Sequence, residues 1–163
     1  MPVTVDIIKQ HLNTLEIGFG VDDKDPNSVG FGINTKNYVN GEGQKSIIVC
    51  CDVREDGNYL EVYCPMVEDL SKCRFKGAAL AAMAEICYRT KHAQLEYDPR
   101  DGEVRIAADM PVCDSVVTAE QLLALARNVV MVMDAYQPVI RHAMETGQVD
   151  MNKMWQPPES QGS

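Results

Sequence analysis

The sequence has few basic residues. Of its 163 residues, 15 are Lys or Arg and 24 are Asp or Glu, which gives a formal net charge of −9 at pH 7. Non-specific binding to nucleic acid depends on basic side chains that neutralise phosphates, and binding to an anionic membrane surface depends on the same charges. The composition therefore argues against nucleic acid and membrane partners.

Long hydrophobic runs are also missing. No apolar stretch approaches the ~18–20 residues that cross a bilayer, so we expect no spanning helix. The first residues, 1–6, lack the basic start and apolar core of a secretory signal. The hydrophobic fraction of 45% is ordinary for a globular protein, and the length suits one domain with an enclosed core.

Cysteine pairs with the C-x-x-C spacing of zinc or redox sites are absent, although the chain has six cysteines. Cys50, Cys51 and Cys64 lie in apolar strand-like runs, and Cys87 lies in an Ala-rich helical segment. Free thiols in such places behave as small hydrophobic groups. We therefore expect buried thiols in a reducing compartment, which indicates the cytoplasm.

Motifs for catalysis and cofactor binding are missing too. The segment 41–46 resembles a phosphate-binding loop only superficially, because Gln44 precedes Lys45 and the segment leads into a strand. His11, His92 and His142 are not one helical turn apart, and we expect His11 and His142 on helix surfaces. No G-x-S-x-G sequence is present. The sequence therefore predicts no metal, no cofactor and no catalytic residue.

Hydrophobic periodicity predicts three helices and two hairpins. The helices are expected at about 3–16, 75–91 and 118–146. The hairpins pair 46–53 with 59–64 around Asp56-Gly57, and 93–97 with 103–107 around the turn 98–102. A short strand is expected at 29–33, and Pro65 is expected to end the second strand of the first hairpin.

The last predicted helix has an unusually wide apolar surface. Thr118 and Gln121 form a capping box at its start, Gly147 stops it, and Pro138 is expected to kink it near residue 134. Two adjacent stripes cover more than the roughly 100° that a surface helix buries. The first contains Leu122, Leu125, Val129, Val132, Tyr136 and Val139, and the second contains Leu123, Ala126, Val130, Met133, Ile140 and Met144.

Two arrangements explain this surface. Either the helix is central and covered by its own chain, or one stripe packs on the sheet and the other on a second subunit. The sequence favours a homodimer with the first stripe at the interface. We expect one domain over 1–147, followed by a polar tail, 148–163, that Trp155 could anchor to the body or to a partner.

The order of elements resembles the type III secretion chaperone-like fold and, within it, the YbjN-type family of bacterial sensory transduction regulators. The similarity covers about residues 3–146. It is carried by 47–64 with Asp56-Gly57 at the turn, 78–88, 95–106 around 98–102, and 118–142. This resemblance implies an α+β domain whose antiparallel sheet has helices packed on one face, commonly in a homodimer. Secretion chaperones with this fold hold unfolded segments of partner proteins.

The leading hypothesis is a non-catalytic, homodimeric protein-binding module, chaperone-like or regulatory, in a bacterial cytoplasm. The expected partner-binding residues, which could equally be core residues, are Ile7, Ile8, Leu12, Leu15, Tyr59 and Tyr63. An alternative is a small-molecule-binding domain or enzyme with a pocket between sheet and helices. A third is a structural subunit that uses the tail around Trp155 as a hook.

Overall fold

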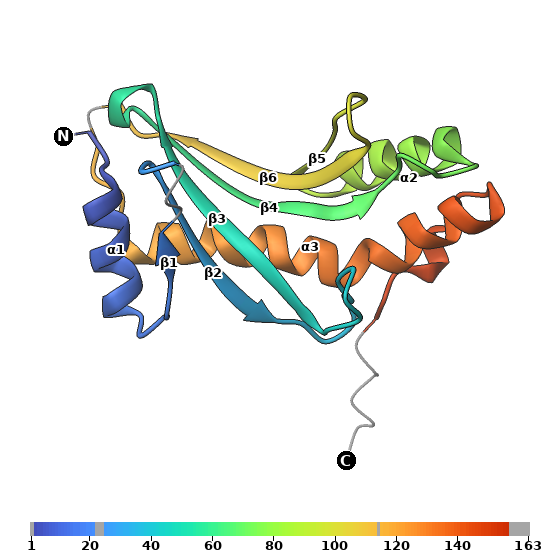
Figure 1. Cartoon of the computed structure of the whole chain (residues 1–163), viewed down its shortest axis with the longest axis horizontal. Coiled ribbons are helices and arrows are strands. Elements are labelled where there is room, and N and C mark those ends of the chain that lie inside the picture. Colours follow the sequence, from blue (N-terminus) through green and yellow to red (C-terminus); the bar gives the residue numbers. More distant parts are fainter. Residues whose placement is uncertain (1, 22–24, 114, 157–163) are drawn as a thin grey trace, which may run out of the picture.

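A long helix, α3 (Ala119–Thr146), lies across one face of an antiparallel sheet (Figure 1). The computed structural model describes residues 2–21, 25–113 and 115–156. Within these ranges the sheet has six strands in the order β1-β2-β3-β4-β6-β5. Their bounds are β1 (Gly20–Val21), β2 (Ser28–Asn34), β3 (Ser46–Arg54), β4 (Tyr59–Asp69), β5 (Gln94–Tyr97) and β6 (Glu103–Pro111).

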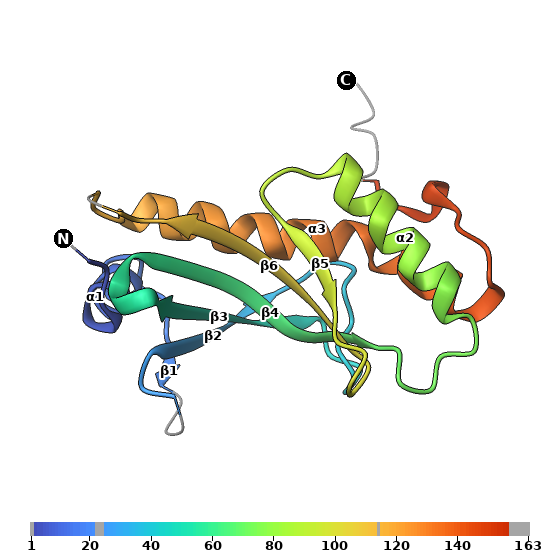
Figure 2. The ribbon, with the colours of Figure 1, turned by 90° about the horizontal axis from the view of Figure 1, so that it is seen from above.

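Two further helices complete the helical layer. Helix α1 (Val5–Thr14) packs on α3 and on β2, and α2 (Lys76–Arg89) packs on α3 and on β5. Figure 2, seen from above, shows α3 along one side of the sheet with α2 next to it, and the opposite face is uncovered. Single 3-10 turns occur at η1 (Glu55–Gly57) and η2 (Met151–Lys153). The predicted α+β class, with helices on one face of an antiparallel sheet, is confirmed.

The core lies between α3 and the inward face of the sheet. Along β4, Leu60, Val62 and Cys64 are fully buried, whereas Tyr59 and Tyr63 point to the other face, as the alternation in the sequence predicts. The same alternation holds on β2, β3 and β6. One face of the sheet therefore supplies the core, and the other faces away from the helices.

Both predicted hairpin turns depend on a glycine. Gly57 and Gly102 have φ of +87° and +91°, in the left-handed region that favours glycine. A Cβ on Gly57 would lie 2.4 Å from the Val3 carbonyl oxygen, and one on Gly102 would lie 2.4 Å from the Ser71 amide nitrogen. Each turn therefore also serves as a contact point for a segment distant in the sequence.

Three strands differ from expectation. β4 does not end at Pro65 but continues to Asp69 through an irregularity between Cys64 and Glu68, where Met66 has a φ of +48°. β6 runs to Pro111 because its far half pairs with the first half of β4. The two-residue strand β1 was not predicted, since so short a strand has no periodicity to recognise.

Helix α3 begins and ends as predicted. Thr118 and Gln121 form the capping box, and Gly147 takes the left-handed conformation with a φ of +76°. Pro138 lies inside α3, which continues through it as one helix to Thr146. Beside this proline, the Trp155 amide donates a 2.9 Å hydrogen bond to the Ala135 carbonyl. The tail up to residue 156 thus folds back on α3, whereas its predicted remainder, 157–163, lies outside the described residues.

One carboxylate on α3 fixes the loop that follows β2. Asp134 Oδ1 accepts hydrogen bonds from three consecutive backbone amides, those of Lys36, Asn37 and Tyr38, at 3.0, 2.7 and 2.9 Å. A carboxylate that accepts several amide N–H groups binds more strongly than a neutral acceptor. Asp134 therefore holds the end of β2 against the middle of α3.

A second set of polar contacts continues this junction one turn later. Gln137, which is 2% exposed, accepts a hydrogen bond from the Val39 amide and donates to the Val39 carbonyl and to Glu68. Arg141 donates to the same carbonyl and to Glu68 at 2.8 and 2.7 Å. Burial raises the pKa of Glu68, and Arg141 opposes that shift. The buried side chains are thus hydrogen-bonded across three elements.

Replacing Gly102 by Ala should lower the free energy of unfolding by about 2 kcal/mol or more, because a left-handed residue gains a Cβ that collides with Ser71. Urea denaturation measures this. The matched variant Gly41→Ala, at an exposed site where a Cβ meets nothing within 4 Å, should change stability by less than about 0.5 kcal/mol. Equal effects of the two substitutions would contradict the role assigned to Gly102.

The substitution Asp134→Ala should leave three amides without their acceptor and cost about 2–3 kcal/mol. Hydrogen exchange followed by NMR should show faster exchange at residues 36–38. Glu145→Ala, at an exposed position of the same helix, is the control and should leave these amides protected. Unchanged exchange in Asp134→Ala would rule out the proposed anchoring of the loop.

Candidate protein-binding face

The face of the sheet turned away from α3 is the face seen in Figure 1. Its outward positions on β2 include Gly30 and Gly32, which pair with Cys50 and Ile48 of β3. Gly20 of β1 pairs with Gly30 on the other side. Three neighbouring outward positions thus carry no side chain. The backbone of β1 and β2 is exposed there as the floor of a shallow groove, which we call the glycine trough.

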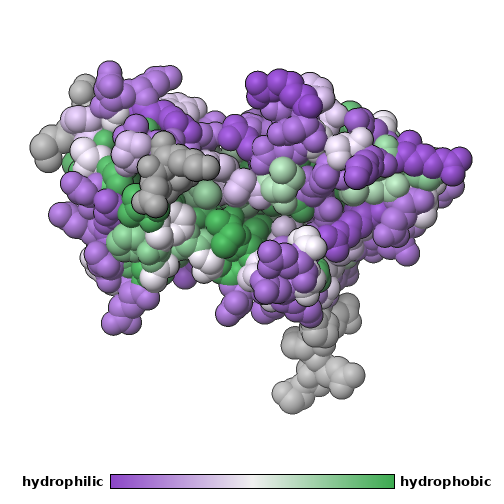
Figure 3. All heavy atoms as spheres, in the orientation of Figure 1, coloured by the Kyte–Doolittle hydropathy of each residue, from purple (hydrophilic) through white to green (hydrophobic). Residues whose placement is uncertain are grey.

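Apolar side chains form the walls of the glycine trough. Phe19, Ile48, Tyr63 and Pro65 line it, and it has a volume of about 800 Å³. Ile48 is 55% exposed, which is high for a large aliphatic side chain in the middle of a sheet. Figure 3 shows the green apolar surface gathered over β2 and β3, with purple polar surface above it. Contiguous exposed apolar surface of this kind is typical of binding sites.

The trough continues into a second groove. Ile48 and Pro65 also line an adjoining cavity of about 460 Å³, whose other walls include Tyr38 and Met66. Met66 is exposed, and burial raises the pKa of Tyr38 to about 12, so its hydroxyl stays protonated. The two grooves share Ile48 and Pro65 as lining residues and therefore adjoin along the open face.

A row of carboxylates crosses the same face next to the trough. Asp52, Glu61 and Asp109 lie directly opposite one another on β3, β4 and β6, and we call them the acidic row. Like charges in such cross-strand positions repel each other. Arg54, the last residue of β3, forms ion pairs with Asp52, with Glu61 and with Asp25 in the loop before β2. The arginine therefore offsets part of this repulsion.

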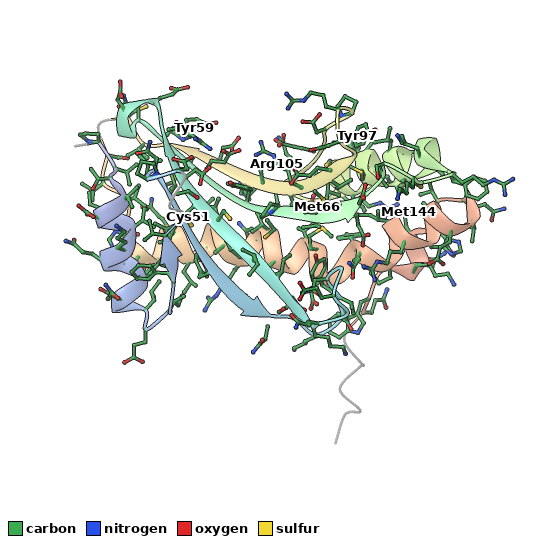
Figure 4. All side chains as sticks on the ribbon, viewed as in Figure 1. Cys51, Tyr59, Met66, Tyr97, Arg105 and Met144 are labelled. Atoms are coloured by element: carbon green, nitrogen blue, oxygen red, sulfur yellow. The ribbon has the colours of Figure 1, made fainter. Side chains whose placement is uncertain are left out.

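Arg105 connects the acidic row with the trough. Its guanidinium lies 5.2 Å from the centre of the Tyr63 ring, and it forms ion pairs with Glu61 at 3.0 Å and Glu96 at 2.6 Å. Burial and the negative charge of Asp52 raise the pKa of Tyr63, so its hydroxyl remains protonated at neutral pH. In Figure 4, Tyr59, Arg105 and Met66 mark successive positions along this face.

The two edges of the sheet differ in accessibility. At the β5 edge, the Cys87 thiol of α2 accepts a 3.2 Å hydrogen bond from the Leu95 amide, so the helix covers that edge. At the opposite edge, β1 pairs only with Val29 and Gly30, and β2 continues to Asn34. Among the described residues, no strand pairs with this second half of β2 on its outer side, which adjoins the trough.

The predicted partner-binding residues separate into two groups. Tyr63 lines the trough, and Tyr59 lies on the same face beside Asp109, whose charge is the main cause of its raised pKa. Ile8 and Leu12 of α1 are fully buried in the core of their own chain. Ile7 and Leu15 are half-buried. The first helix therefore presents little apolar surface, because its stripe stabilises the protomer itself.

The stripe predicted for a dimer interface is also divided. Leu122 and Val129 are buried in the core beneath the sheet, whereas Leu125, Val132 and Tyr136 are half-buried at its margin. The most exposed large apolar residue of α3 is Met131, at 67%. The helix is thus largely covered by its own chain, and only its outer side is accessible to a second copy.

The glycine trough is the feature that the sequence analysis missed. Gly30 and Gly32 lie in the strand predicted at 29–33 and alternate with Val29 and Phe31, which point into the core. A glycine at every second position of such a strand indicates an outward face without side chains. That signal was present, but the adjacent Gly20 could not be predicted, because it depends on the pairing of β1.

None of the six cysteines is in a disulfide, and Cys51 and Cys64 are buried as predicted, whereas Cys50 and Cys87 are only half-buried. Burial raises the pKa of Cys51 to about 12 and raises that of Cys64 as well, so neither is a thiolate at neutral pH. Within residues 2–21, 25–113 and 115–156, no three His, Cys, Asp or Glu side chains gather as a metal site. His11 differs from expectation, since it is half-buried and its Nε2 lies 2.8 Å from the Val117 carbonyl oxygen.

Comparisons with known proteins found a similarity of fold. No family model matches the sequence, and no curated protein matches it. YbjN from E. coli, described as a candidate transcription regulator, aligns with a TM-score of 0.58 over 91% of this chain and 96% of that chain, at 14% identity. This chain has the YbjN fold. The resemblance to YbjN expected from the order of elements is therefore confirmed at the level of the fold.

Two other solved structures are similar to a smaller degree. A chain of the HopA1–SchA chaperone–effector complex aligns with a TM-score of 0.49 at 10% identity, over 78% of this chain and 88% of that one. An uncharacterised protein from Methanothermobacter thermautotrophicus aligns with a TM-score of 0.47 at 11% identity, over 88% and 97%. Among the described residues, none of the helices combines the length and the apolar character that crossing a membrane requires.

Thiol labelling tests the positions of the cysteines. With a chromogenic disulfide reagent at pH 8, Cys113 should react first because it is exposed, whereas Cys51 and Cys64 should react only after unfolding in urea. The Cys113→Ser variant should lose the fast phase. A fast phase that survives this substitution, or rapid labelling of Cys51 in the native protein, would contradict the assignment.

Proposed function

We propose that this chain is a non-catalytic protein-binding module, chaperone-like or regulatory, that holds an extended apolar segment of a partner polypeptide on the open face of its sheet. The observation that carries the proposal is the glycine trough. A floor without side chains lets a second backbone approach the sheet closely, and the apolar walls at Phe19, Ile48 and Tyr63 accept side chains.

The glycines are not required by the packing of the protomer. A Cβ on Gly30 or Gly32 would meet nothing closer than 3.8 Å, and one on Gly20 would meet nothing within 4 Å. Glycine in a strand lowers stability relative to residues with side chains. The three glycines lower the stability of the protein, and no contact within the chain requires them. Their presence on one patch therefore supports a role in contact with a ligand.

The shape of the site favours a polypeptide over a small molecule. A pocket for a small ligand encloses most of the ligand surface, whereas the trough and the groove that adjoins it lie open along the sheet. The uncovered half of β2 borders the trough and offers backbone groups to an extended chain. The alternative of an enzyme or small-molecule-binding domain has in its favour a cavity of about 450 Å³ between β5, β6 and α3, which is smaller than the trough.

The proposal includes a homodimer in the cytoplasm. The absence of a disulfide at all six cysteines suits a reducing compartment. The outer side of α3, with the exposed Met131 and the half-buried Leu125, Val132 and Tyr136, is the part of the predicted interface that a second copy could still contact. This surface lies on the opposite side of the sheet from the trough, so pairing would leave the trough accessible.

A strand-forming peptide tests the binding face. A fluorescein-labelled peptide of twelve residues, alternating Val and Ser, should bind the wild-type protein. Ile48→Asp should weaken its affinity at least tenfold, because a charge would enter the apolar wall. Tyr88→Asp, at a 92% exposed site on α2, is the matched control and should change affinity less than twofold. Absence of binding to the wild type, or equal effects of both variants, would refute the proposal.

Sedimentation tests the dimer separately. The wild-type protein should sediment at micromolar concentration with about twice the 18.1 kDa mass of one chain. Met131→Asp should shift it to the single-chain mass without a change in its circular dichroism spectrum, because the residue is exposed in the protomer. A wild-type protein that sediments as a single chain would exclude the dimer and leave the peptide-binding proposal intact.

A further inference from the structure

We infer that the segment bound on the open face carries a Lys or Arg two positions beyond its apolar residues, in the pattern apolar-x-apolar-x-basic. This inference rests on the proposed function, because it names the chemistry of the segment that the glycine trough holds. It follows from the order in which outward side chains succeed one another along two neighbouring strands.

The trough and the acidic row occupy consecutive outward positions. On β3 the successive outward residues are Ile48, Cys50 and Asp52. On the antiparallel strand β4, Tyr63 lies opposite Cys50 and Glu61 lies opposite Asp52. Each step is two residues, or about 6.6–6.8 Å. An extended segment aligned with these strands repeats the same distance on the face it turns toward the sheet. When two apolar side chains lie over the trough, the next residue of that face lies over the acidic row.

The charge of the acidic row is only partly neutralised within the chain. Arg54 and Arg105 are the arginines in contact with it, and each already forms ion pairs with two or more carboxylates. The acidic row and the two flanking carboxylates, Asp25 and Glu96, outnumber these arginines by three. Asp109 forms no ion pair among the described residues and is exposed. Asp52 is 1% exposed and Glu61 is largely covered, so a basic side chain meets this excess negative charge chiefly at the exposed Asp109, and an acidic one is repelled there.

The position of Arg105 supports the same geometry. Its guanidinium packs on the Tyr63 ring at the border between trough and row while its nitrogen atoms contact Glu61 and Glu96. The surface therefore suits a Lys or Arg side chain of the bound segment, with its methylene groups beside the trough and its charged end on the acidic row. Salt screens such exposed interactions, so the preference for a basic residue is expected to depend on ionic strength.

Four peptides of equal length test the inference by fluorescence anisotropy. The reference peptide alternates Val and Ser. In the second and third peptides, one Val that follows two other Val positions is replaced by Lys or by Glu. In the fourth peptide, the Ser next to that Val is replaced by Lys. At 50 mM NaCl the Lys-for-Val peptide should bind about three- to tenfold more tightly than the reference, and the Glu peptide more weakly. The peptide with Lys on the opposite face should gain little. At 500 mM NaCl the differences should largely disappear.

Two charge-matched double variants locate the effect. Glu96→Gln with Asp109→Asn removes two negative charges at the β6 and β5 end of the acidic row and should abolish most of the preference for Lys. Glu120→Gln with Glu145→Gln removes two exposed charges from α3, behind the sheet, and should preserve it. Both pairs avoid residues buried in the core.

The outcomes separate this inference from the proposed function. If the neutral and the Lys peptides bind equally well, the inference is wrong and the proposed function stands. If no peptide binds, the proposed function fails and the inference fails with it. If both double variants reduce the preference equally, the net charge of −9 and not the acidic row is responsible, which also overturns the inference.

Discussion

The burial of α3 against one face of the sheet is the constraint on which the remaining structure depends. The inward residues of β4, Leu60, Val62 and Cys64, are completely covered, and burial of each aliphatic side chain contributes roughly 1.5–3 kcal/mol. Because one helix of 28 residues packs against β3, β4 and β6, α1 and α2 need only fill the ends of the helical layer. The opposite face is left without a covering layer, and its side chains are therefore available for other roles.

The polar junction on α3 makes this arrangement specific. Asp134, Gln137 and Arg141 occupy successive turns and bind the loop after β2 and the far part of β4. An apolar stripe alone could slide along the sheet, whereas hydrogen bonds to named backbone groups fix one position. The end of β2 is thus held in place, and the open edge that borders the glycine trough has a defined geometry.

Local signals in the sequence were sufficient where local chemistry decides the structure. Asp56-Gly57 and the turn 98–102 specified both hairpins, and Thr118, Gln121 and Gly147 specified the ends of α3, because each acts through neighbours in the chain. Pairing between distant segments was not accessible in this way. β1 exists only because β2 lies beside it, and β4 continues past Pro65 because β6 offers it further partners.

Burial was the other quantity that periodicity could not supply. Ile8 and Leu12 repeat at helical spacing whether a helix covers its own sheet or a partner, and only the tertiary arrangement decides that they are core residues. For the candidate site the sequence placed Tyr59 and Tyr63 on the outward face but did not reveal the acidic row. Asp52 and Glu61 lie on the two strands of the predicted first hairpin, whereas Asp109 is distant in sequence and becomes their neighbour only through the pairing of β4 with β6.

The return of the chain after Gly147 has a practical consequence for anyone who attaches a label or an immobilisation handle. Since Trp155 is tied to Ala135, position 156 emerges roughly 16 Å back from the tip of the helix, near its middle. A fluorophore or surface linker joined there would report on the central part of the rod, and a probe meant for its far tip belongs in the bend around residue 148.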